Sequence, residues 1–425
     1  MHLLNNVAMN KKLFSILLLV LTAIFALPEN AFASGSSEDG KVDLKGIIFH
    51  HLGDGYGWEV PFSHTRRIPL PVIVRAENGS WHCFMSSNLV ELKNEKDANG
   101  EEHEKAVNVV YTADDGSQFM IAPHSSANKN KVVQVTPLSS DEEAMVLAKA
   151  DSISKADGIE LAEVGIDGYA NDHGHFYKEY KPFDMSITKN VLAIFISAIV
   201  VFFMIMSIAR WHRKNGMKAP RKGLGFVELV IDYIYKGVIQ ATLGDKAPKF
   251  APYLLTAFFF ILVMNLLGLI VIFPGGANLT GNIAITLTLA VLTFIVTNVL
   301  GTKHYWKEIF WPEVPMFLKF PLPIMQMIEI FGIFTKPAAL CVRLFANMMG
   351  GHMIVITLTG LIFIFAAFGY AAAGGTAVIS LLFSIFMLVL DVLVSFIQAY
   401  VFTMLSTMFI SMAQEGGHHE EHKHE

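Results

Sequence analysis

The pattern of apolar and polar positions changes near residue 189. Before that point, short runs rich in β-branched residues are separated by clusters such as Asp114-Asp115-Gly116, which predicts strands joined by turns. The predicted strands are Pro69 to Val74, Val107 to Thr112 and Lys131 to Thr136. Ser140 followed by Glu143 is a capping-box signature, so one helix is expected to begin there.

Beyond residue 189 the chain contains long runs without Asp, Glu, Lys or Arg. Val191 to Ala209 is long enough to cross the hydrocarbon core of a bilayer as a helix. Phe226 to Leu243 has apolar residues on one side and charged residues on the other, which predicts a helix lying along a membrane surface. Phe250 to Thr302 is interrupted only at Pro274-Gly275-Gly276 and therefore predicts a helical hairpin.

The last uncharged runs are longer than an upright membrane helix requires. The pattern predicts one helix from Pro337 to Phe368 and another from Ala377 to Ala413, with a break near Gly374-Gly375. A span needs only about 20 residues, so two steeply tilted helices fit this length better than two upright ones. The alternative is an upright pair with extra turns outside the bilayer, but apolar turns in water have no evident source of stability.

Charge at the ends of these runs predicts the orientation of the chain. Lys11 and Lys12 precede a short apolar run and the small-x-small site Ala31-Phe32-Ala33, which is typical of a cleaved signal peptide, although an uncleaved signal anchor stays an alternative. The segment from Arg210 to Lys222 is rich in cations, which places that end of the first membrane helix in the cytoplasm. Five crossings then leave the N-terminal part periplasmic and the C-terminus cytoplasmic.

Composition agrees with a membrane protein. The 425 residues are 53% hydrophobic and only 16% charged, whereas about 25% is usual in soluble domains. The formal net charge of −5 gives no support for nucleic-acid binding. We therefore expect an all-α polytopic membrane protein with five transmembrane helices, the last two long and steeply tilted, a surface helix and a small β-containing exported domain.

The expected boundaries follow from these changes of pattern. Residues 1–33 are assigned to a signal peptide, 34–187 to the exported domain, 188–414 to the membrane domain and 415–425 to a cytoplasmic tail rich in His and Glu. The density of charge in the tail favours a solvated terminus over a metal site. No zinc spacing, phosphate loop or nucleophile elbow is present in the sequence, so neither a metal nor a cofactor is expected and the chain is not expected to carry out ATP chemistry.

Arg343 is the main candidate functional residue because it lies in the apolar sequence Leu340 to Asn347, far from either end of its run. An ionisable residue inside a membrane span is costly and is a functional hypothesis by default. A guanidinium keeps its charge at physiological pH, so this residue would act as a fixed positive barrier rather than as a proton carrier. The structural alternative is an arginine bonded to carbonyls or to a carboxylate of its own chain.

Further polar residues accompany it in the last hundred residues. Asn347 shares the helical face of Arg343, and His352 lies nine residues beyond it with a side chain suited to a proton relay. Asp391, Ser395 and Gln398 form one stripe on the last helix. Taken singly, Asn347 is more often an interhelical hydrogen-bonding residue, and His352 is about as often a packed core residue.

Glu329 and Lys336 precede the first long helix. They are interpreted either as an interfacial ion pair or as the cytoplasmic mouth of a proton path.

The segment Lys336-Pro337 followed by Arg343-Leu344-Phe345-Ala346-Asn347-Met348-Met349-Gly350-Gly351-His352 resembles the signature of subunit a of F-type ATP synthases. Met264-Asn265-Leu266-Leu267-Gly268-Leu269 and Gln398-Ala399-Tyr400-Val401-Phe402 resemble two further motifs of that family. The similarity extends in order from about Thr188 to Ala413.

The resemblance implies a proton-conducting stator subunit in the bacterial inner membrane. It implies two offset half-channels that open onto a rotating ring of c subunits, with Arg343 between them coupling proton flow to rotation. Other implied partners are b-type peripheral stalk subunits, the remainder of the ATP synthase and membrane lipid. By resemblance, Asn347, Gln398, His352 and Asp391 belong to the proton path, with Asn265, Ser395 and Lys336 as supporting residues.

Two departures from the family pattern matter. At His352 and Asp391 the carboxylate and the histidine that some members carry are exchanged, so the order of the proton relay is open. Gly268 replaces an acidic residue of some members, and Glu329 is a candidate substitute.

Other functions stay open from residues alone. The chain could be a stand-alone proton channel or a proton-coupled secondary transporter, which would conduct without partners. It could also be a membrane-anchored exported binding domain in which Arg343 is structural.

Overall fold

The structure is a computed structural model of the chain. It describes residues 54–59, 67–96, 102–123, 126, 128–157, 164–172, 175–216, 218–220, 223–270, 277–310, 324–366 and 370–414. The expected signal peptide, the turn at Pro274-Gly275-Gly276 and the C-terminal tail lie outside these residues.

The N-terminal part is built from small antiparallel sheets. The largest has the order β10-β11-β9-β8-β7, a second has the order β12-β3-β4, and β1-β2 and β5-β6 form two-stranded pairs. The strands are β1 (Gly57–Glu59), β2 (Arg67–Pro69), β3 (Pro71–Arg75), β4 (Trp81–Met85), β5 (Val90–Lys96), β6 (Glu102–Asn108), β7 (Tyr111–Thr112), β8 (Gln118–Ile121), β9 (Val132–Pro137), β10 (Tyr169–Asp172), β11 (His175–Tyr180) and β12 (Phe183–Asp184). A short 3-10 helix, Ser86–Leu89, follows β4.

The predicted strands fall on observed ones, with shifted ends. Pro69 to Val74 spans the end of β2 and most of β3, and Lys131 to Thr136 overlaps β9. Val107 to Thr112 was predicted as one strand, but the structure divides it between β6 and β7, which pair with different strands. Such a change of partner is set by tertiary packing and leaves no mark on the local pattern.

The predicted helix of this part is α3, Ser140–Asp157. Its cap differs by one residue from the expected capping box. The carbonyl of Ser139 accepts a hydrogen bond from the Glu143 backbone N–H, and the Ser139 hydroxyl donates to Glu142, which makes Ser139 the residue that caps this helix.

The rest of the chain is helical. Its helices are α4 (Lys189–Asn215), α5 (Gly223–Ile234), α6 (Ala241–Leu243), α7 (Ala247–Leu269), α8 (Ile283–Val299), α9 (Lys303–Phe310), α10 (Ile324–Ala366) and α11 (Tyr370–Gln414). A π-helical segment, Tyr235–Gln240, joins α5 to α6, and a 3-10 turn, Gly244–Lys246, leads into α7. Helices therefore occupy each of the stretches that the apolar runs predicted.

The long pair differs from its prediction at two ends. α10 begins at Ile324 rather than at Pro337, so Pro337 lies inside the helix. An interior proline removes one backbone hydrogen bond but does not forbid the helix, and apolar residues continue on both sides of it. Gly374-Gly375 lies within the first turns of α11 rather than at the break between the helices.

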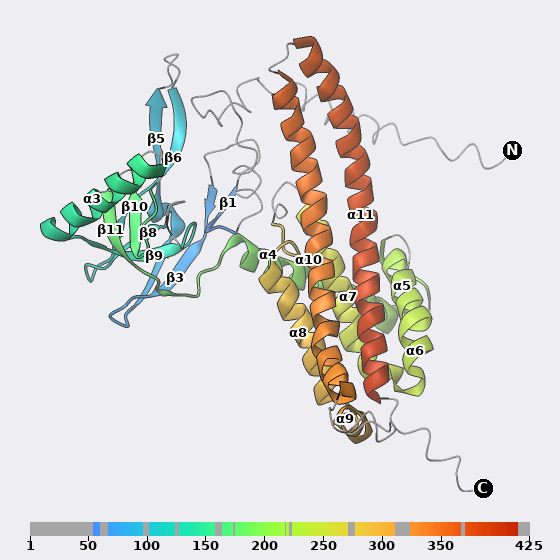
Figure 1. Ribbon diagram of the computed structural model, residues 1–425. Helices are drawn as coiled ribbons and strands as arrows, with labels where there is room; N and C mark the ends of the chain where they lie inside the picture. The colour runs from blue at the N-terminus through green and yellow to red at the C-terminus, as the bar shows by residue number, and fades with distance from the viewer. Residues whose placement is uncertain are drawn as a thin grey trace, which may run out of the picture.

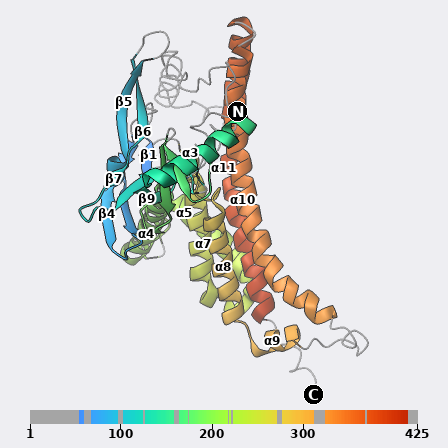
Figure 2. The ribbon, with the colours of Figure 1, turned by 60° about the vertical axis from the view of Figure 1, so that its left-hand side comes forward.

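Three helical segments of the described chain are long and apolar enough to cross a membrane, namely Lys189–Asn215, Gly223–Leu269 and Val378–Gln414, and Ile283–Val299 is a shorter apolar helix. Figure 1 shows α10 and α11 side by side and extending well beyond α7 and α8. The β-rich part lies on one side of this pair and α5 on the other, and α4, which joins them, packs against α7 and α5. The turned view in Figure 2 also shows the far halves of α10 and α11 standing clear of α7 and α8.

The helices share one apolar core. α7 contributes most of its fully buried large side chains, including Phe258, Ile261 and Met264, while α11 adds Phe402 and Ile410. α7 packs against α4 and α11, and α8 packs against α10. These contacts cover only one face of each long helix, because large apolar side chains such as Phe331, Leu382 and Val389 are exposed.

The β-rich part is tied directly to the start of α4. Trp58 on β1 is 4% exposed and belongs to the same buried cluster as Ala193 of α4 and Leu279, which precedes α8. The backbone N–H of Lys189 donates to the carbonyl of Gly55, and that of Asn190 donates to the Asp54 carboxylate. The β-rich part and the membrane helices therefore share packing and are not joined by the chain alone.

We predict that Trp58→Ala loosens this junction. Truncating a buried tryptophan costs about 3–5 kcal/mol, and the loss here falls on the contact between the two parts. Limited proteolysis of membranes containing the variant should cut between residues 54 and 190 faster than in the parent. Trp58→Phe, which keeps an aromatic ring, is the matched control, and equal cleavage of Trp58→Ala and the parent would contradict the prediction.

Candidate functional site

Arg343 lies on the exposed face of α10. Leu340, Cys341 and Leu344 around it are buried, whereas Val342 and Arg343 are exposed. Arg343 makes no hydrogen bond or ion pair with any residue that the structure describes. The structural alternative, an arginine bonded within its own chain, therefore finds no partner in the described part.

Asn347 shares this exposed face, one helical turn beyond Arg343. The surrounding exposed residues on α10 and α11 are large and apolar, among them Phe334, Ile354, Leu393 and Ile397. A permanent charge and an amide thus lie within an apolar surface that the described part of the chain does not cover.

Asp391 on α11 faces α10 at Gly351. An ideal Cβ built on Gly351 would lie 2.7 Å from Oδ1 of Asp391, so the carboxylate lies directly against the glycine backbone. Gly351 immediately precedes His352, whose backbone belongs to α10 but whose side chain lies outside what the structure describes. The two long helices therefore bring Asp391 to the turn that carries His352.

Buried polar side chains connect α7 to the same stripe of α11. The Thr280 hydroxyl donates to Oδ1 of Asn265 at 2.7 Å, and Nδ2 of Asn265 donates to the carbonyl of Ser395 at 3.5 Å. The Ser395 hydroxyl bonds the Asp391 carbonyl at 2.7 Å. Gln398, one turn further, is buried, and its Oε1 has no partner within the described part.

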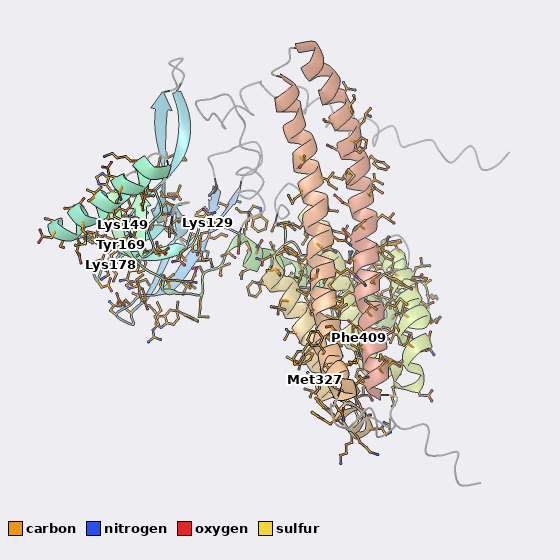
Figure 3. The ribbon with its side chains drawn as sticks, in the orientation of Figure 1. Lys129, Lys149, Tyr169, Lys178, Met327 and Phe409 are labelled. Atoms are coloured by element: carbon orange, nitrogen blue, oxygen red, sulfur yellow. The ribbon has the colours of Figure 1, made fainter. Side chains whose placement is uncertain are left out.

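A small cavity of about 20 Å³ lies near α9, where α8, α10 and α11 meet. That volume suits one water molecule. Its polar lining comes from Lys336, Thr297, Asn298 and Tyr305, and the Lys336 ammonium lies 5.6 Å from the centre of the Phe409 ring. Figure 3 labels Phe409 and Met327 and shows both toward the end of the bundle that carries α9.

Glu329 is also near this cavity. Burial raises the pKa of Tyr305, and the negative charge of Glu329 raises it further. Glu329 and Lys336 do not form an ion pair, although both are described, so that interpretation of the two residues is wrong. The two residues are seven positions apart on α10. Lys336 lies over the Phe409 ring, whereas Glu329 lies near Tyr305.

Sequence reasoning did not assign a role to residues that matter because they contact a candidate site residue on another helix. Nothing about Gly351 or Thr280 marks it locally, because their importance depends on which side chain another helix brings against them. Tyr305 could have been noted, since a tyrosine beside Trp306 at the end of an apolar hairpin is typical of a membrane interface.

The fold and site define a multi-pass α-helical membrane protein that displays a charged residue on an uncovered apolar face. The family described as ATP synthase A chain matches residues 191–411. The chain belongs to this family. A second match, over residues 47–138, is to a family described only as a domain of unknown function.

Relatives support the same assignment. ATP synthase subunit a of Chloroherpeton thalassium is 38% identical over 266 residues, which is 60% of this chain and 76% of the relative. ATP synthase subunit a 2 of Chlorobaculum tepidum is 42% identical over 237 residues, covering 55% and 65% of the two chains. ATP synthase subunit a of Myxococcus xanthus is 36% identical over 251 residues, covering 57% and 78%.

We predict that Gly351→Ala impairs proton transport. The added methyl group would displace the Asp391 carboxylate, because it would lie 2.7 Å from Oδ1. ATP-driven proton pumping should fall while the amount of subunit in the membrane stays unchanged, as measured by vesicle acidification and immunoblotting. Pumping equal to that of the parent would mean that the position of this carboxylate does not matter.

Proposed function

We propose that this chain is the proton-conducting stator subunit of a rotary ATP synthase. It provides two offset half-channels to a ring of c subunits, and Arg343 couples proton passage to rotation of the ring. The chain is a non-catalytic subunit of the complex. Membership of the ATP synthase subunit a family supports this role.

The observation that carries the proposal is the uncovered surface around Arg343. A guanidinium facing lipid at the centre of a span is unfavourable by roughly 2.5–3.5 kcal/mol on insertion scales. A carboxylate supplied by another membrane subunit removes that penalty and needs no partner from this chain. The long apolar faces of α10 and α11 on either side fit the same occupant, because they are exposed over many turns.

The fixed charge also accounts for coupling. A ring carboxylate arriving at Arg343 must be deprotonated to pair with it, whereas a protonated carboxyl gains nothing from the contact. A proton therefore cannot pass directly from one side of Arg343 to the other and must travel with the ring.

The outer half-channel is assigned to Asp391, His352, Gln398 and Asn347, with Asn265 and Ser395 in support. The contact of Asp391 with Gly351, beside His352, supports a shared site on α10 and α11. The buried bonds from Thr280 through Asn265 to Ser395 support a polar route on the α7 side.

The inner half-channel is assigned to the end of the bundle near α9. The cavity with Lys336 and the neighbouring Glu329 support a polar mouth there. Five membrane crossings, with residues 34–187 in the periplasm and the C-terminus in the cytoplasm of a bacterial inner membrane, complete the proposal. As the stator subunit, this chain would also bind the peripheral stalk.

Arg343→Ala should abolish coupled proton pumping. Without the fixed charge, a ring carboxylate can stay protonated as it passes, so passive leak increases while ATP-driven acidification of vesicles disappears. Arg343→Lys is the control that keeps a charge but loses the planar fork of donors. Normal pumping in Arg343→Ala, with normal membrane insertion, would refute the proposed function.

Exchanging the types at His352 and Asp391 tests whether they act as a pair. The double variant His352→Glu with Asp391→His should pump protons better than either single variant, because it keeps one acid and one base near each other. Each single change leaves two like groups that favour the wrong charge state. A double variant no better than the worse single variant would mean that the two residues act separately.

A further inference from the structure

A second group of buried polar atoms lies where the β-rich part meets the membrane helices. Asn190, the second residue of α4, is 4% exposed, and Asn278, between α7 and α8, is 7% exposed. Neither residue was singled out in the sequence. The Asn190 backbone bonds Asp54 of the N-terminal part, and Leu279, next to Asn278, belongs to the same buried cluster as Trp58 of β1.

Each of the two asparagine side chains has a buried polar atom that no described residue bonds. The Asn190 backbone N–H donates to Asp54 at 3.2 Å, but its side-chain Oδ1 has no partner among the described residues. Oδ1 of Asn278 accepts from the Gly281 backbone N–H at 2.9 Å, which leaves its Nδ2 without one. Each residue thus keeps one buried polar atom, an acceptor on Asn190 and a donor on Asn278, for which the described part of the chain shows no partner.

Buried polar atoms in proteins are bonded to other protein groups or to ordered water. Leaving one unsatisfied costs about 1–3 kcal/mol, so two such atoms demand partners. Water suits each of these atoms, because it can donate to Oδ1 of Asn190 and accept from Nδ2 of Asn278.

Apolar side chains flank these amides in the sequence. Ala193, Ala277 and Leu279, close in sequence to the two asparagines, belong with Trp58 to the large buried cluster. The β-rich part therefore forms one wall of the junction, and the membrane helices form the other.

Hydrogen bonds lead from this junction toward Asp391. Thr280 is two residues from Asn278 and 1% exposed, and it donates to Asn265. Asn265 bonds the Ser395 carbonyl, and Ser395 bonds the carbonyl of Asp391 one turn back. Polar groups thus continue from the junction, across α7, to the turn of α11 that carries the carboxylate.

We propose that protons reach Asp391 from outside through this junction, carried by water that Asn190 and Asn278 hold. The amides donate and accept hydrogen bonds but keep their own protons, so each transfer runs between waters and ends on the Asp391 carboxylate. The inference rests on the proposed function. It gives the exported part a role as a wall of the proton entrance.

Thiol labelling tests access by water. In the assembled complex carrying Cys83→Ser, because Cys83 is exposed, Asn278→Cys and Asn190→Cys should react with a small, membrane-impermeant thiol reagent added from outside. Leu279→Cys is the matched control, since Leu279 is a neighbour of Asn278 and fully buried in the apolar cluster. Modification of both asparagine positions but not of Leu279→Cys is expected, and no modification at either asparagine position would overturn the proposal.

Transport tests whether that water carries protons. Asn190→Leu and Asn278→Leu should each slow ATP synthesis driven by an imposed proton gradient about tenfold, which corresponds to about 1.4 kcal/mol of barrier. Asn278→Asp keeps the acceptor for Gly281 and a polar surface for water, so it should retain most of the rate. Ser197→Ala is the matched control on α4, because the Ser197 hydroxyl is equally buried but already bonded to Ala193.

The outcomes separate this inference from the proposed function. Labelled cysteines with unchanged transport in both Leu variants would mean a static hydrated pocket and would overturn the inference. Equal loss in Asn278→Leu and Asn278→Asp would assign the defect to the turn and would also overturn it. If either of these two results were obtained while Arg343→Ala still lost coupling, the proposed function would be retained. The proton entrance would then lie elsewhere in the structure.

Discussion

The need of an exposed guanidinium for an oxygen partner is the constraint on which the rest of this structure depends. Arg343 lies on an apolar face of α10 and makes no hydrogen bond or ion pair with the described part of its own chain. Neither lipid tails nor the neighbouring apolar side chains can satisfy five N–H donors. The other helices serve this face indirectly, because α7 and α8 bury the opposite sides of α11 and α10 and leave the charged side free.

Much of the helical architecture could be predicted because charge is excluded from the apolar interior. Runs without charged residues indicated where the long helices lie and how far they extend, since each run had to satisfy its backbone internally. The ends of the helices were harder to predict. Pro337 looked like a helix start, yet α10 continues through it, because an interior proline removes one backbone hydrogen bond without forbidding the helix. The strands of the N-terminal part are short, so their pairing depends on contacts far apart in sequence.

The candidate site was also predictable only in part. Arg343 and Asp391 stand out by residue type, because a charge inside an apolar run is conspicuous in any sequence. The environment of Asp391 was not predictable: its contact with Gly351 exists only because α10 and α11 lie side by side at one register. Glu329 and Lys336 also stand out by residue type, but their neighbours were not predictable. An ion pair was one of two interpretations of these residues, but packing placed the lysine over Phe409 and the glutamate near Tyr305.

The junction between the β-rich part and the helices follows from a balance of burial and hydration. Trp58 gains stability by entering the apolar cluster, and that same packing encloses Asn190 and Asn278. Leucine side chains of nearly the same size would close the junction without leaving buried polar atoms unsatisfied. Water at the junction would satisfy the two amides, and Asn278 is two residues from Thr280, whose bond to Asn265 begins the polar groups that lead to Asp391. A seal made entirely of apolar side chains would have separated that carboxylate from the outside.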